Sequence, residues 1–272
     1  MDSNTTFQVG SVAQEKHSKL YWIFSDNWVL IKRSTTHITR NMDQLLGVIF
    51  QPIMFMLLFR YVFGGAIETG TSYVNFLFAG ILVQMAAFGA TTTAFGVATD
   101  LTRGIVDRFK SLPMRSWTVL NGHVISDLAR NLISAAVLTI VAFAVGFRPN
   151  ASALDWLAVI GILLLFTLAI SWLSAILAMF VKSIEGVQWA TFIIIFPLTF
   201  ASSAFVPSNS MPGWLQTFAV NQPVTHVIEA IRALTIGRPV GDHALMSVIW
   251  SLALLAIAIP VASWAFRRHT SK

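Results

Sequence analysis

From residue 153 to residue 181 the sequence runs for 29 residues with a single charged side chain, that of Asp155. A hydrocarbon core about 30 Å thick is crossed by a helix of about 20 largely apolar residues. Composition points the same way, because 56% of the 272 residues are hydrophobic and 11% are charged, whereas soluble domains contain about 25% charged residues. The sequence therefore predicts an integral membrane protein.

Five further stretches have the same apolar character, which makes six predicted transmembrane helices in an all-α fold. In chain order the six run over residues 44–63, 73–99, 122–147, 153–181, 187–206 and 244–266. No soluble domain, linker or internal repeat separates them. We therefore expect residues 1–272 to form a single membrane domain.

Lysine and arginine are distributed unevenly between the two sides of these helices. The tail before the first helix, the segments after the second and fourth helices and the C-terminal end contain 13 of them, and the opposite segments contain four. Because cytoplasmic segments retain basic residues, we expect a multi-pass protein with both termini in the cytoplasm. Their position at the edges of apolar runs also argues against nucleic acid as a partner, which would need a basic surface. The lack of cysteine excludes disulfides and thiolate metal sites.

Within residues 19–40, the apolar stretch 19–33, KLYWIFSDNWVLIKR, is too short to span the membrane and is interrupted by Ser25, Asp26 and Asn27. Four apolar side chains recur there at helical spacing beside two basic ones: Leu20, Phe24, Trp28 and Ile31, with Lys32 and Arg33. This arrangement is typical of an amphipathic interface helix that lies among the headgroups of membrane lipids. The alternative is an ordinary juxtamembrane stretch that its tryptophans anchor.

A search for catalytic and nucleotide-binding patterns gives no catalytic residue and no metal site. Residues 104–111, GIVDRFKS, approach the pattern of a phosphate-binding loop, but Phe109 stands in place of the second glycine and blocks close approach of the backbone to phosphate. The chain contains neither G-x-S-x-G nor H-E-x-x-H. We expect a protein that is not an enzyme and has no cofactor of its own. An intramembrane lipid- or peptide-processing enzyme is the less favoured alternative.

Ion-coupled carriers place ionisable residues near the bilayer midplane, and the centres of the six predicted helices lack them. Asp127 and Arg130 enter the third helix three residues apart, so they share one helical face and can pair. The pair either neutralises itself or links the adjoining cytoplasmic loop to the membrane interior. An ion-coupled secondary carrier stays as an alternative function.

The cytoplasmic segment 100–117, DLTRGIVDRFKSLPMRSW, contains six charged residues among eighteen. The charges alternate with Ile105, Val106, Phe109 and Leu112, and Pro113 follows. A short amphipathic helix that ends in a turn fits this pattern and would dock into a groove of another protein. The alternative is a solvated loop whose arginines only fix the topology.

On the opposite side of the membrane, four prolines divide residues 207–241 into short pieces. Amphipathic patterns occur around Trp214 and over residues 227–234, and neither is long enough to span. Glu229 and Arg232 are three residues apart and are expected to pair. This pair is either an exposed surface ion pair of little energetic value or part of a device that closes the outer side.

Three stretches carry a resemblance to a known family. They are FSDNWVLIKRSTTHITRN at 24–41, DLTRGIVDRFKSLPMR at 100–115 and FAVNQPVTHVIEAIRAL at 218–234. In this order, and together with six predicted helices, they resemble the transmembrane subunits of type 2 ABC exporters, specifically the daunorubicin-resistance-like branch. The resemblance covers nearly the whole chain.

The resemblance implies a permease that moves an apolar or amphipathic substrate, a drug-like molecule or a lipid, out of the cytoplasm or the inner leaflet of a bacterial cytoplasmic membrane. Its implied partners are two copies of a cytoplasmic ABC ATPase, which would bind the ATP and Mg, and a second permease that is either the same chain or a close paralogue. It also implies that residues 207–241 contain a short re-entrant helical segment before the last span.

The same resemblance assigns roles to particular residues. Contact with the ATPase would involve Arg103, Gly104, Asp107, Arg108, Phe109, Leu112, Pro113 and Arg115. The substrate path or dimer interface would involve Ala86, Ala90 and Ala94 of the second helix with Phe192, Phe196 and Phe200 of the fifth. The outer segment would use Trp214, Asn221, Gln222, Pro223, Glu229 and Arg232. For the second and fifth helices, ordinary packing or lipid contact is the alternative.

Overall fold

The computed structural model describes residues 42–67, 69–102, 117–181 and 183–270. Within these ranges every regular element is a helix, which confirms the all-α prediction. The long helices are α2 (Met42–Leu58), α3 (Tyr73–Thr102), α5 (Trp117–Val145), α6 (Ala153–Phe180), α7 (Ile184–Phe200) and α10 (His243–Thr270). The short ones are the π-helical turn η1 (Phe59–Phe63), the 3₁₀ turn η2 (Ser208–Ser210), α8 (Gly213–Asn221) and α9 (Pro223–Ile236).

Four of the described helices are long and apolar enough to cross a membrane: Tyr73–Thr102, Leu120–Val145, Ala153–Phe180 and His243–Phe266. They coincide with the second, third, fourth and sixth predicted spans. The first and fifth predicted spans correspond to shorter apolar helices, α2 with η1 and α7. The chain is thus an integral membrane protein with four helices of full spanning length in its described part.

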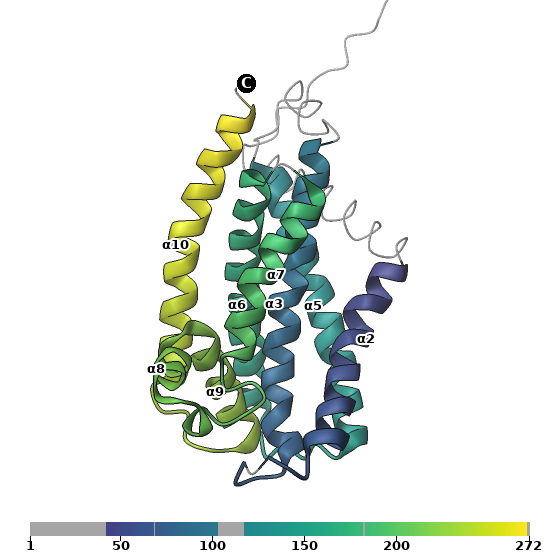
Figure 1. The fold of residues 1–272 in the computed structure, drawn as a ribbon, viewed down its shortest axis with the longest axis vertical. Coiled ribbons are helices and arrows are strands. Elements are labelled where there is room, and N and C mark those ends of the chain that lie inside the picture. The colour runs from purple at the N-terminus through teal and green to yellow at the C-terminus, as the bar shows by residue number, and fades with distance from the viewer. Residues whose placement is uncertain (1–41, 68, 103–116, 182, 271–272) are drawn as a thin grey trace, which may run out of the picture.

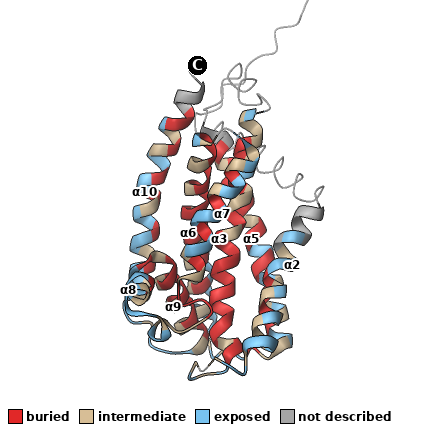
Figure 2. Ribbon diagram, viewed as in Figure 1, coloured by how far each residue is buried: buried red, intermediate tan, exposed pale blue. Residues whose placement is uncertain are grey.

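The long helices run side by side, with α3 at the centre of the bundle (Figures 1 and 2). Of the apolar window of α3, 83% is buried within the chain, whereas 22% of the window of α10 is buried. α3 contacts α2, α5, α6, α7 and α9, and α10 packs on α6 and α9. We call the end where α3 stops and α5 starts the 103–116 end, and the opposite one the α8–α9 end (Figure 1).

Helix α7 ends at Phe200, six residues before the predicted boundary at Val206. Residues 201–206 form turns that are largely buried, and the backbone amide of Ala201 closes the helix by donating to the Pro197 carbonyl at 2.8 Å. The sequence stays largely apolar through residues 201–206, so hydrophobicity alone does not mark the end of the helix. In the structure, carbonyls of this segment accept hydrogen bonds from side chains distant in the sequence and not from a further helical turn.

The two short amphipathic patterns of the outer segment form α8 and α9, as predicted. Pro223 lies in the first turn of α9, where its missing N–H costs no helical hydrogen bond. Gly237 ends α9 in the left-handed conformation with φ of +73°, which favours glycine. Because α9 contacts α3, α6 and α10, most of its apolar face is buried within the bundle.

Candidate transport surface and coupling region

The residues predicted to contact an ATPase lie outside the described part of the chain, and so do those of the interface helix. The first group is Arg103, Gly104, Asp107, Arg108, Phe109, Leu112, Pro113 and Arg115. The second is Leu20, Phe24, Trp28, Ile31, Lys32 and Arg33. Both assignments stay predictions, and the structure describes the helix ends on either side of the first group.

A side-chain pair joins these two helix ends. His123 of α5 places Nε2 at 2.8 Å from Oδ2 of Asp100 on α3. Gly96, one turn earlier on α3, faces the same imidazole ring, and a Cβ atom at that position would lie 2.7 Å from Nδ1 of His123. The absence of a side chain at Gly96 therefore lets the ring reach α3.

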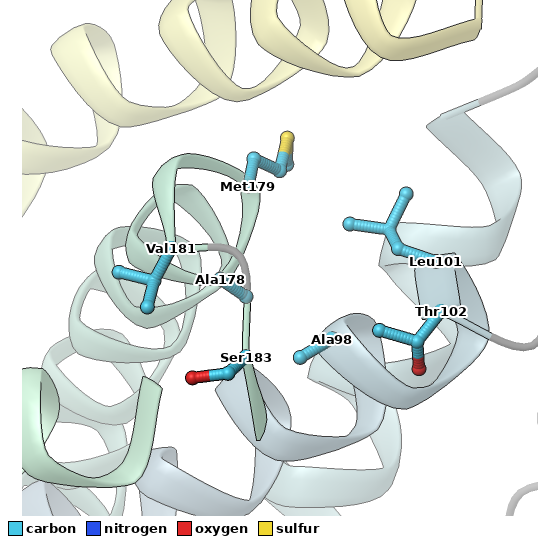
Figure 3. A pocket seen from close by; sticks show the side chains of 7 residues that line it. All are labelled: Ala98, Leu101, Thr102, Ala178, Met179, Val181 and Ser183. Atoms are coloured by element: carbon cyan, nitrogen blue, oxygen red, sulfur yellow. The ribbon is translucent and has the colours of Figure 1, made fainter. Parts of the chain in front are cut away.

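A small hollow of about 180 Å³ opens at the same 103–116 end, between α3 and the connection from α6 to α7 (Figure 3). Its lining is mostly small and apolar and consists of Ala98, Leu101, Thr102, Ala178, Met179, Val181 and Ser183. Ser183 also caps α7, because its hydroxyl accepts a hydrogen bond from the Gly186 amide at 3.1 Å. Among the described residues that line the hollow, none carries a charge.

Asp127 and Arg130 pair as predicted, and they do so inside the bundle. The Asp127 side chain is fully buried, and it accepts hydrogen bonds from Arg130, from Ser171 of α6 and from Nδ2 of Asn131 at 3.2 Å. Arg130 also donates to the hydroxyl of Thr92 on α3. The pair therefore belongs to a hydrogen-bonded cluster that connects α3, α5 and α6. Asp127 and Arg130 thus do more than neutralise each other.

Glu229 and Arg232 also pair, and the Nη1–Oε1 distance is 2.5 Å. Their alternative interpretation as an exposed ion pair is wrong for Arg232, whose side chain is almost fully buried. The guanidinium donates to the carbonyls of Phe76 at 3.1 Å and Ser203 at 2.6 Å, and it stacks on the Phe76 ring at 3.6 Å from the centroid. Arg232 thus joins α9, α3 and the segment after α7.

Other side chains hold the same segment, residues 201–206. Gln222 donates to the Ala201 carbonyl at 2.5 Å, and the Tyr73 hydroxyl donates to the Phe205 carbonyl at 3.1 Å. The backbone also packs directly on Gly80 of α3, where a Cβ atom would lie 2.1 Å from the Ala204 carbonyl oxygen. Non-helical backbone in an apolar region requires such internal partners, which explains why Gln222 is buried.

The remaining predicted residues of the outer segment lie at the surface or at a helix start. Trp214 and Asn221 of α8 are exposed, and Asn221 bonds only within its own helix, from Nδ2 to the Thr217 carbonyl at 2.8 Å. Pro223 opens α9. Within this predicted set, the hydrogen bonds to other parts of the bundle therefore come from Gln222 and Arg232, and Glu229 pairs with Arg232 on the same helix.

The three phenylalanines predicted on the fifth helix lie on one side of α7 and continue a longer series of rings. Phe192 and Phe196 are about two fifths exposed, and Phe200 is half-buried. Consecutive ring centroids lie 4.2–6.1 Å apart along Trp189, Phe192, Phe196, Phe200, Phe205 and Phe59. We call these six residues the aromatic series. The series is exposed at Trp189, Phe192 and Phe196 and continues inward through the half-buried Phe200 and Phe59 and the buried Phe205.

The alanines predicted on the second helix lie elsewhere. Ala86, Ala90 and Ala94 have no exposed surface in the single chain and belong to its two hydrophobic cores. Their small side chains allow neighbouring helices to approach α3 closely. This burial favours the alternative of ordinary packing for the three alanines and separates them from the aromatic series.

Sequence reasoning missed most of the residues that complete these clusters. Phe76 and Ser203 contact Arg232, Gly80 packs on the Ala204 backbone, and Thr92 and Ser171 lie beside the Asp127–Arg130 pair. No spacing pattern connects residues so far apart in the chain. The available signal was the presence of glycine and hydroxyl residues within apolar helices, where close approach and polar contact are their usual roles.

Within the described ranges, no group of three or more His, Asp and Glu residues is arranged to hold a metal ion. An all-helical bundle whose described part contains four helices long and apolar enough to cross a membrane, and whose buried charges there are paired, defines an integral membrane protein. The chain belongs to the ABC-2 type transporter family, which its residues 25–236 match. It is accordingly a permease subunit of an ABC exporter.

Individual relatives agree with this assignment. The chain is 29% identical over 249 residues to the daunorubicin resistance ABC transporter permease protein DrrB1 of Streptomyces coeruleorubidus, covering 89% of this chain and 88% of the relative. It is 27% identical over 236 residues to the probable doxorubicin resistance ABC transporter permease protein DrrC of Mycobacterium tuberculosis, covering 85% and 84%. It is also 28% identical over 232 residues to the putative transport permease ycf38 of Cyanophora paradoxa, covering 81% and 78%.

Proposed function

We propose that this permease exports an apolar or amphipathic molecule, drug-like or lipid, from the cytoplasm or the inner leaflet of a bacterial cytoplasmic membrane. Two of the relatives are named for resistance to daunorubicin and doxorubicin. The observation that carries the proposal is the aromatic series, because rings with exposed faces bind planar apolar molecules by area and stacking and need few directional contacts.

The proposed topology has six spans, with α2–η1 and α7 as the two that complete the set. α2 and η1 follow each other without a break and comprise 22 residues, which corresponds to about 33 Å of helix. α7 has 17 residues, which is at the lower limit for a span. In this topology the 103–116 end is cytoplasmic, as the distribution of basic residues predicts, and α8 and α9 form the re-entrant segment.

The energy source in this proposal is a separate ABC ATPase that binds ATP and Mg. Two ATPase subunits would act on two permeases through residues 103–115, whose charged and apolar side chains alternate. The second permease, another copy of this chain or a paralogue, would face the exposed side of α7. Trp189 of the aromatic series is exposed there, and so are Ile193 and Ile194.

Transport by the purified permease and its ATPase, reconstituted together in vesicles, tests the proposal. Phe192→Ala and Phe196→Ala should each lower uptake of a fluorescent anthracycline while leaving assembly intact, because both shorten the aromatic series. Phe143→Ala is the matched control, since Phe143 lies on α5 outside the series and is 42% exposed, compared with 41% for Phe192. Equal effects of all three substitutions would contradict the assignment.

A second experiment separates the ATP-driven exporter from an ion-coupled carrier. Vesicles that contain this chain alone should accumulate nothing against a gradient, with or without an imposed proton gradient. Uptake should require the ATPase and ATP on the same side of the membrane as the 103–116 end. Active accumulation by the permease alone would overturn the proposed function.

A further inference from the structure

Helices α3 and α5 are the two that residues 103–116 connect, and polar contacts join them at successive levels. Nearest the connection, Asp100 pairs with His123. Farther into the bundle, Thr92 accepts a hydrogen bond from Arg130, and Arg130 lies 3.4 Å from the Gly89 carbonyl. Residue numbers fall along α3 as they rise along α5, so the contacts follow the antiparallel alignment of the two helices.

Two glycines of α3 make room for polar side chains of α5. A Cβ atom on Gly89 would lie 2.5 Å from Oδ1 of Asn131, and one on Gly96 would lie 2.7 Å from Nδ1 of His123. Seven residues separate the two glycines, which is close to two helical turns and places them on the same face of α3. Glycine at both positions therefore lets α5 insert an amide and an imidazole against the α3 backbone.

The deeper contacts are anchored to a third helix. Ser171 of α6 donates to the second carboxylate oxygen of Asp127, while Arg130 donates to the first. In a bundle of apolar helices, interhelical hydrogen bonds add to side-chain packing, and because they are directional they favour one register of the two helices. The contacts therefore bind α3 and α5 to each other and tie both to α6.

We propose that these contacts make α3 and α5 one rigid lever, which transmits movement of the 103–116 connection into the membrane interior. We call the contributing residues the polar rungs: Gly89, Thr92, Gly96 and Asp100 of α3, with His123, Asp127, Arg130 and Asn131 of α5. The inference rests on the proposed function, in which an ATPase acts on that connection. The rungs are positioning residues, because they act through the two helices and touch neither ATP nor cargo.

The outermost rung is the best one to break, because Asp100 and His123 are partly exposed, so the carboxylate that His123→Ala deprives of this contact still reaches water. His123→Ala should still assemble with the ATPase and hydrolyse ATP, while the amount transported per ATP falls by about tenfold. The matched control is Ser126→Ala, since the Ser126 hydroxyl donates only within its own helix, to the Gly122 carbonyl at 2.8 Å. The control should keep the normal ratio of transport to hydrolysis.

An engineered disulfide in place of the Asp100–His123 contact tests the lever directly. The chain is suited to this experiment because it contains no cysteine. In Gly96→Cys/His123→Cys the new side chains should meet, since a Cβ atom on residue 96 lies 3.6 Å from Cγ of His123, the atom whose place the sulfur of a cysteine at 123 would take. Oxidation with copper phenanthroline should restore transport per ATP to near the normal value. Reduction with dithiothreitol should abolish that recovery, which a role in folding alone does not predict.

The outcomes distinguish this inference from the proposed function. If the unaltered permease with its ATPase transports nothing, the proposed function fails. If it transports normally and His123→Ala does the same, only the lever is overturned. Where His123→Ala fails to assemble, the oxidised cysteine pair decides: coupled transport supports the lever, and hydrolysis without transport overturns it.

Discussion

Two acid–arginine pairs, each three residues apart on one helix, are alike in sequence and opposite in structure. In Asp127–Arg130 the acid is the fully buried partner, and it collects hydrogen bonds from two helices. In Glu229–Arg232 the arginine is the buried partner, while the glutamate side chain keeps 30% of its surface exposed. The spacing of three residues predicts that each pair forms. The packing of the surrounding helices determines which partner, the acid or the arginine, is the more deeply buried charge.

The difference lies in what each buried charge does for its neighbours. Asp127 accepts hydrogen bonds from side chains and thereby joins helix to helix. Arg232 donates to main-chain carbonyls, including that of Ser203 in the turns that follow α7. One pair therefore fixes the register of packed helices, and the other supports a backbone segment that has left the helical conformation.

The largest expected effect comes from removing the acid of the inner pair. Asp127→Leu leaves Arg130 buried without its carboxylate and should lower the free energy of unfolding by about 3–5 kcal/mol. Asp127→Leu/Arg130→Leu should be less destabilised than the single variant, because it buries no unpaired charge. Unfolding in mixed detergent and dodecyl sulfate measures both. A double variant less stable than the single one would show that the cluster acts through its hydrogen bonds more than through its charge.

In the outer pair the arginine should matter more than the acid. Arg232→Leu removes charged hydrogen bonds to buried carbonyls and should cost about 3 kcal/mol. Glu229→Gln should cost less than Arg232→Leu, because the amide oxygen of glutamine can still accept a hydrogen bond from the guanidinium after the charge is lost. The same unfolding assay tests the order of the two values. A loss on Glu229→Gln equal to that on Arg232→Leu would remove the contrast between the pairs.

A glycine substitution tests the close approach beside Arg232. Gly80→Ala would place a methyl group against the Ala204 carbonyl oxygen, and we expect a cost of about 2 kcal/mol as the turns shift. Gly161→Ala is the control, since a Cβ atom there meets nothing within 4 Å; removing a helical glycine should stabilise α6 by about 0.5–1 kcal/mol. Thermal unfolding followed by tryptophan fluorescence distinguishes a loss from a gain.

The smallest effect is expected from acidification at the α8–α9 end. Burial, and then the nearby His243, lower the pKa of His226 below its ordinary value, and the two Nδ1 atoms lie 3.1 Å apart. The unfolded chain therefore binds this proton more readily, so stability should decrease as the pH falls through about 6.5. His226→Gln should flatten that decline in a series of unfolding curves. An unchanged slope would assign the decline to other groups.

The sequence predicted the helices well because long apolar runs leave few alternatives in a membrane. The starts at Tyr73 and Ala153 agree to the residue, and both acid–arginine pairs form. The predicted end of α7 was wrong, because the side chains that donate to the carbonyls after Phe200, among them those of Gln222 and Tyr73, come from distant parts of the chain. Burial of the α3 alanines was equally out of reach, since a stripe of small residues does not reveal which neighbour it faces. The roles assigned to residues 103–115 stay predictions.

The hydrogen bonds from Gln222, Arg232 and Tyr73 to the turns after α7 have a consequence for how that helix can move. A rod held at one tip swings about it, so displacement of α7 should grow with distance from Phe200 and be greatest at its start, Ile184. Spin labels at these two positions would report the ratio of the two excursions. The end at Phe200 would then serve as the pivot, and the end at Ile184 as the part that moves most.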